Sequence, residues 1–182
     1  LAGSALKSIG VNFLMDAIVR YLPSPAEVAP PKGVEVSPTT TPAALVFKTT
    51  ADPYVGKLSY FRVYSGTIAS NSHVWNCTKQ HDERMGQLYL VRGKTQEPAP
   101  EVAAGDIGAV AKLSVTTTGD TLGSKEHPVS LPGITFPSPI LRMAVQPKTK
   151  ADLDKMGLSL PRLMEEDPTI SIQREADTSE TL

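Results

Sequence analysis

Several features that define common classes of protein are scarce in this sequence. Cys77 is the single cysteine, so no disulfide can form within the chain, and a lone thiol fits a reducing compartment. No apolar run approaches the roughly 20 residues of a membrane span. The sequence does not begin with the basic start and apolar core that would indicate a signal peptide. We therefore expect a cytoplasmic protein with no membrane partner.

The charge balance excludes a further class. Lys and Arg number 18 against 19 Asp and Glu, which leaves a net charge of −1. Proteins that bind nucleic acid through a bulk positive field are strongly basic instead. We expect no DNA partner, and any contact with RNA must be local.

Residues that hold metals or perform catalysis are also sparse. The three histidines, His73, His81 and His127, are far apart and lack the paired spacing of a metal site. No serine lies in a Gly-x-Ser-x-Gly turn. The remaining candidate acids and bases are expected to be solvated, in loops or at a helix end: Asp82, Glu83, Glu165, Glu166 and Asp167. We predict no metal site and no catalytic residue.

Nucleotide-binding motifs are missing as well. A P-loop needs a glycine-rich loop before Lys and Ser or Thr, so that backbone N–H groups and the amine surround phosphates, and no such pattern occurs. No Asn-Lys-x-Asp is present either. An Asp-x-x-Gly match at Asp154–Gly157 lies inside a helical pattern and is interpreted as accidental. The chain is not expected to hydrolyse GTP by itself.

What the sequence does contain is a set of units separated by its 16 prolines. We predict a short helix within residues 1–25, a Pro- and Thr-rich linker at 26–43, a β-barrel at 44–131, and a linker with an α/β region at 132–182. The helix is indicated by an apolar stripe at three- and four-residue spacing: Val11, Leu14, Met15, Ile18, Val19 and Leu22.

The barrel region has apolar runs separated by turns. The predicted strands are Leu45–Phe47, Leu58–Tyr64, Val74–Cys77, Met85–Val91 and Ile107–Leu113. In the second, Phe61 and Val63 should point inward, and Arg62 should lie between two tyrosines on the other face. Ordinary packing is favoured over a dedicated binding face. In the last strand, Ile107, Ala109, Ala111 and Leu113 are expected to share the inner face.

The last third is predicted to form strand, helix and strand. The strands are Ile140–Gln146 and Ile170–Gln173, and the helix between them has Thr149 as its N-cap. Pro161 lies within the helical pattern, so the helix should kink near Gly157 or break into two pieces. Strand, helix, strand is the first part of an α+β sandwich, whose other strands would come from residues not present.

Four stretches together resemble the second and third domains of bacterial elongation factor G or of an elongation factor G-like paralogue. They are DPYVGKLSYFRVYSG from Asp52, TTTGDTL from Thr116, FPSPI from Phe136 and PKTKADLDKMGLSL from Pro147. The resemblance implies a mostly β fold with an α+β part: a translation-factor closed β-barrel, then a truncated ferredoxin-like α/β sandwich. The chain opens in mid-motif and is interpreted as a fragment.

The resemblance also implies sites and partners. GSAL at Gly3–Leu6 resembles the last guanine-recognition motif of the GTPase domain, so Ser4, Ala5 and Leu6 would be a remnant that is not functional alone. No cofactor is expected in the fragment, whereas the full-length parent would use GTP with Mg²⁺. Partners would be the small-subunit ribosomal RNA and the parent's own GTPase domain. Candidate ribosome contacts are Lys57, Arg62, Arg84, Arg92, Lys94, Lys148 and Lys150.

The exact parent stays open at this point. VRGKTQEPAPEV, from Val91, departs from the usual translocase and resembles divergent paralogues. The main hypothesis is a non-catalytic, ribosome-docking and signal-transmitting part of a translocase. The alternatives are a paralogous GTPase of the recycling, ribosomal-protection or release type, or a self-standing β-barrel adaptor for a protein partner.

Overall fold

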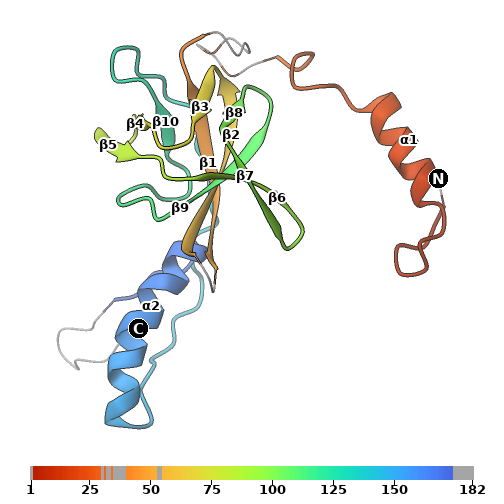
Figure 1. The fold of residues 1–182 in the computed structure, drawn as a ribbon. Coiled ribbons are helices and arrows are strands. Elements are labelled where there is room, and N and C mark those ends of the chain that lie inside the picture. The colour runs from red at the N-terminus through yellow and green to blue at the C-terminus, as the bar shows by residue number, and fades with distance from the viewer. Residues whose placement is uncertain (1, 30, 32–33, 35–39, 53–54, 174–182) are drawn as a thin grey trace. The chain divides into compact units, whose positions relative to one another are not determined.

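The computed structural model describes residues 2–29, 31, 34, 40–52 and 55–173. It contains two compact units, Leu1–Pro30 and Pro31–Leu182, and each is described by itself. The elements drawn in Figure 1 are α1 (Val11–Tyr21), β1 (Ala43–Asp52), β2 (Gly56–Ser65), β3 (Thr67–Ala69), β4 (His73–Asn76), β5 (His81–Arg84), β6 (Leu88–Arg92), β7 (Thr95–Ala99), β8 (Glu101–Ala103), β9 (Ile107–Ala111), β10 (Thr121–Gly123) and α2 (Lys150–Glu166). No helix among the described residues is long and apolar enough to cross a membrane.

The first unit consists of a tight turn and the predicted helix. Ser4 and Ile9 exchange two backbone hydrogen bonds of 3.0 Å, and α1 follows Gly10, whose φ of 74° places it in the left-handed region. Within the described part of the chain, no residue of α1 is buried, although its apolar stripe is present. A helix this short gains most of its stability from packing, and the stripe of α1 is exposed among the described residues.

The second unit is built on one strongly bent antiparallel sheet. Its hydrogen-bonded order is β5-β4-β10-β1-β2-β9-β6-β7, and β3 pairs with β8 in a separate two-stranded ribbon. Among the described residues, no hydrogen-bonded ladder joins β5 to β7, so the order remains open where a closed barrel was expected. The β3–β8 ribbon instead helps to cover the hydrophobic core. Ile68 of β3 and Val102 of β8 belong to the same buried core as Phe61 and Leu122.

The predicted inner face of β2 is confirmed, while that of β9 is wrong by one residue. Phe61 and Val63 are fully buried. In β9, however, Gly108 and Val110 face the core, and Ile107 is 51% exposed. Lys112 has a φ of 60°, so the strand ends before it. Two of the residues predicted to face inward, Ala109 and Leu113, are nevertheless buried, and Leu113 belongs to the core.

The C-terminal part keeps the helix but not the strands. Ile140–Gln146 and Ile170–Gln173 are not strands, apart from a single bridge residue at Val145, and no described strand pairs with either segment. A strand needs a neighbour that satisfies its backbone groups, and the described chain supplies no ladder here. Thr149 is the N-cap as predicted, accepting a hydrogen bond of 3.3 Å from the Asp152 N–H.

Of the two outcomes expected at Pro161, the break does not occur, since α2 runs on as one helix to Glu166, and a kink near Gly157 stays a prediction. The N–H that proline lacks would have donated to the carbonyl of Gly157, four residues earlier. A side chain added at Gly157 would have nothing within 4 Å, so this turn is not crowded by other parts of the chain.

The close approach at Gly108 gives a first prediction. A Cβ at this position would lie 2.7 Å from Val102 Cγ2 and 2.8 Å from Phe61 Cζ, both in the core. Gly108→Ala should therefore lower the free energy of unfolding by about 1–3 kcal/mol, as overpacking does. Urea unfolding of this variant is compared with Gly86→Ala, where a Cβ has nothing within 4 Å. Equal stability of the two variants would contradict the packing described for β9.

Candidate functional site

A buried carboxylate organises one end of the sheet. Glu83 is only 2% exposed and accepts five hydrogen bonds from three consecutive residues, Ser114, Val115 and Thr116. The distances lie between 2.7 Å for the Val115 N–H and 3.1 Å for the Ser114 N–H and hydroxyl. The prediction of a solvated Glu83 is wrong, because the alternation of β5 turns this side chain inward.

The hydrogen bonds keep this carboxylate ionised. Burial alone would raise the pKa of Glu83, since it disfavours the charged form. The N–H groups of Val115, Ser114 and Thr116, with the Thr116 hydroxyl, outweigh burial and leave the pKa below its ordinary value of 4.5. Glu83 is therefore a structural anion at neutral pH, and it holds residues 114–116 against β5.

A second buried carboxylate extends this arrangement into β4 and β10. The Asn76 side-chain amide donates to Thr116 Oγ1 and to Asp120 Oδ2, each at 3.0 Å. Asp120 also accepts from the Thr117 N–H at 2.9 Å and pairs with the Lys79 ammonium at 3.0 Å. We call Asn76, Lys79, Glu83, Thr116 and Asp120 the polar network. The TTTGDTL motif is thus committed to internal contacts.

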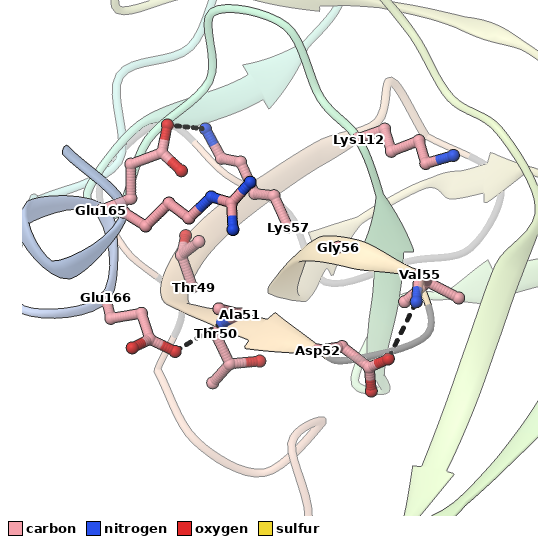
Figure 2. Close-up of a pocket in the computed structure, with 11 residues that line it drawn as sticks. Thr49, Thr50, Ala51, Asp52, Val55, Gly56, Lys57, Lys112, Glu165 and Glu166 are labelled. Atoms are coloured by element: carbon pink, nitrogen blue, oxygen red, sulfur yellow. Dashed lines mark hydrogen bonds and ion pairs between the residues drawn. The ribbon is translucent and has the colours of Figure 1, made fainter. Parts of the chain in front are cut away.

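A separate hollow lies where the β1–β2 hairpin meets the end of α2 (Figure 2). Its volume is about 560 Å³. The Glu165 carboxylate lies 3.4 Å from the Lys57 ammonium, and the Glu166 carboxylate accepts a hydrogen bond from the Ala51 N–H. Two further cations, Lys112 and Arg162, line the same hollow. Lys112 and Arg162 were missed from the sequence, because neither periodicity nor a local motif marks them.

The candidate ribosome contacts do not form one patch. Lys57 is 16% exposed in its side chain and already paired with Glu165. The Arg62 guanidinium lies 5.0 Å from the centre of the Tyr64 ring. Arg84 is exposed on the edge strand β5, at the opposite end of the strand order from the β6–β7 hairpin.

The remaining four candidates are exposed. Arg92 pairs with Glu97 across the β6–β7 ribbon, and Lys94 lies in its turn. Lys148 and Lys150 lie at the start of α2. Exposed cations of this kind can contact phosphates, although Arg92, like Lys57, already has an acidic partner.

The predicted guanine-recognition remnant forms the tight turn before α1. Ser8 N–H donates to the Ala5 carbonyl within the turn, and Leu6 is 97% exposed. Such a turn offers backbone groups to the edge of a base but nothing that would surround phosphates. Among the described residues, no group of three or more His, Cys, Asp or Glu could hold a metal ion.

Comparison with known proteins identifies two successive regions of the chain. The family model for elongation factor G domain 2 matches residues 41–125, and that for Elongation Factor G, domain III, matches residues 136–182. This chain belongs to the elongation factor G family. The polar network lies in the domain 2 match and α2 in the domain III match. The hollow of Figure 2 is lined by residues from both matched regions.

One solved structure is similar to this chain over nearly its whole length. A protein from Thermus thermophilus is similar to this chain with a TM-score of 0.78 and 30% sequence identity. The match covers 97% of this chain and 26% of the Thermus chain. The elongation factor G segment described here therefore corresponds to about a quarter of the length of that protein.

The Glu83 contacts predict a pH-dependent stability. Glu83→Gln replaces one acceptor oxygen with a donor that faces backbone N–H groups, and should cost about 2–4 kcal/mol of unfolding free energy at pH 7. Because the folded-state pKa is lowered, the stabilisation is present above the unfolded value and is lost as pH falls through the folded value. The difference between wild type and variant should therefore shrink below about pH 4.5.

Denaturant titrations from pH 7 to pH 3 test this expectation. Glu101→Gln is the matched control, because Glu101 is exposed on β8 and should change stability by less than about 0.5 kcal/mol. A Glu83→Gln variant as stable as this control at pH 7 would contradict the role assigned to the buried carboxylate.

Proposed function

We propose that this chain is a non-catalytic, ribosome-docking segment of a translational GTPase. In this account the full-length parent is cytoplasmic, uses GTP with Mg²⁺ and promotes translocation during protein synthesis. The observation that carries the proposal is the uninterrupted order of two elongation factor G domain matches, over residues 41–125 and 136–182. The segment transmits a change made by the nucleotide domain and performs no chemistry of its own.

The physical basis of transmission is a domain that moves as a unit. Buried, fully hydrogen-bonded charges tolerate only one arrangement of their donors, because an unpaired buried charge is costly. The polar network ties β4 and β5 to residues 114–117 and to Asp120, the residue before β10, in this way. Displacement of one edge of the sheet is therefore passed on to the other strands.

Docking on small-subunit ribosomal RNA would use local cations. The net charge of −1 provides no general attraction, so individual Lys and Arg side chains must lie on phosphates. Arg84, Arg92 and Lys94 are exposed on β5 and the β6–β7 hairpin and are the best placed of the candidates in the domain 2 match.

One observation favours a paralogue with a different task. The divergent VRGKTQEPAPEV segment forms much of the β6–β7 ribbon, in which Arg92 is paired with Glu97. A pair of this kind reduces the positive charge that the hairpin offers to RNA. Recycling, ribosomal protection or release is therefore the second candidate role for the parent.

Co-sedimentation of the full-length protein with small ribosomal subunits tests docking. Replacing Arg84, Arg92 and Lys94 by Ala should weaken binding. The plot of log affinity against log salt should also become less steep by about 3, roughly one for each phosphate that is no longer neutralised. The matched control replaces Lys7, Lys48 and Lys155, which removes the same charge. Equal binding by the two triple variants would count against a role for these three cations in docking.

Toeprinting on ribosomes programmed with messenger RNA separates the two roles. A one-codon advance with GTP is expected for a translocase. Ribosome-stimulated GTP hydrolysis without an advance would overturn translocation and support the paralogue.

A further inference from the structure

We propose that the β1–β2 end of the barrel is a docking surface for the acidic C-terminal end of α2, and that the last turn of α2 is stable only when docked there. The contact joins the domain 2 region to the domain III region within one chain. The proposal does not depend on binding to the ribosome.

The charges at the end of α2 disfavour the free helix. A helix C-terminus carries unpaired carbonyl groups and a partial negative charge, so cations stabilise it and anions destabilise it. The last turn of α2 contains Glu165 and Glu166, Asp167 is the C-cap, and no basic residue lies in that turn. The sequence therefore places negative charge where an isolated helix tolerates it least.

The barrel supplies what this helix end lacks. The Lys57 ammonium lies 3.4 Å from Glu165, and the Ala51 N–H near the end of β1 donates to Glu166. Both contacts are drawn in Figure 2. Consecutive helical residues point about 100° apart, so two adjacent carboxylates fix the rotation of the helix as well as its position.

Additional positive charge surrounds the ion pair. Lys112 and Arg162 line the hollow, and in the described part of the chain neither side chain forms an ion pair. The Lys112 N–H donates to the Lys57 carbonyl at 2.8 Å, which holds the two lysine backbones together. Figure 2 shows the Lys112 side chain directed away from Glu165, so it adds to the positive field without replacing Lys57. Arg162 belongs to α2 itself, so the positive charge that the barrel offers to Glu165 and Glu166 comes from Lys57 and Lys112.

Hydrogen–deuterium exchange of the full-length protein tests this docking locally. Lys57→Glu leaves the helix sequence unchanged and should speed exchange of a peptide spanning residues 158–167 by about threefold to tenfold. Glu165→Lys should speed it less, because a cation also stabilises a free helix C-terminus. The double variant Lys57→Glu/Glu165→Lys restores the ion pair in reverse and should return exchange to within about twofold of wild type. Lys48→Glu is the matched control, since Lys48 is exposed on the same hairpin and should leave the peptide unchanged.

The readout separates docking from general unfolding. A peptide covering β9 reports the barrel core, and its exchange should be unaffected in Glu165→Lys, whose mutated residue lies outside the sheet. Unchanged exchange of residues 158–167 in Lys57→Glu would overturn the proposal. A double variant that remains as fast as the single variants would overturn it too. Short RNA can also be added to the Glu165→Lys variant. If the RNA binds at Lys57 and restores protection there, the surface is a phosphate site and the helix is rejected as its occupant.

Discussion

The ionised carboxylate of Glu83 is the constraint on which the rest of the sheet depends. Removing a charge from water is costly unless donors surround it, and here three consecutive N–H groups and two hydroxyls do so. The chain between β9 and β10 must therefore bend around β5. The same bend places Asp120 beside Asn76 and Lys79, and lets Gly119 and Asp120 bond to Val46 of β1.

The sequence predicts those parts of the structure that rest on periodic apolar residues. The inward side chains of β2, the helix before Pro23 and the Thr149 cap all follow from local spacing. The polar network could not be predicted, because it joins residues from Asn76 to Asp120 whose partners are set by tertiary structure. Glu83 looked solvated for the same reason, since HDER contains no apolar alternation that marks an inner face.

Other differences arise where a partner is needed. Ile140–Gln146 has the alternation of a strand, yet no strand among the described residues lies beside it to form a ladder. α2 has no buried residue of its own in the described chain, and its polar contacts with the barrel come from two carboxylates at its end. Local pattern thus predicts which segment is helical, while docking decides how that helix is attached.

These features fit a segment that relays movement in an elongation factor G-type protein. The polar network holds the sheet together through buried charge. The helix α2 is attached to the sheet by ionic contacts, which salt and competing anions weaken. The basic side chains of Arg84 on β5 and of Arg92 and Lys94 on the β6–β7 hairpin stay exposed to a polyanion. Asp120 and Glu165 are paired with other cations, Lys79 and Lys57, and Glu83 is held by N–H groups and hydroxyls.

Native-state hydrogen exchange of single amides tests the central claim that the polar network makes the barrel one rigid body. The Val115 and Thr116 amides donate to Glu83 and lie outside any strand, so ordinary loop behaviour would open them locally. Our account predicts that both exchange only through global unfolding, with the same free energy as the Phe61 amide in β2. Exchange of these two amides at a much lower free energy than that of Phe61 would contradict it.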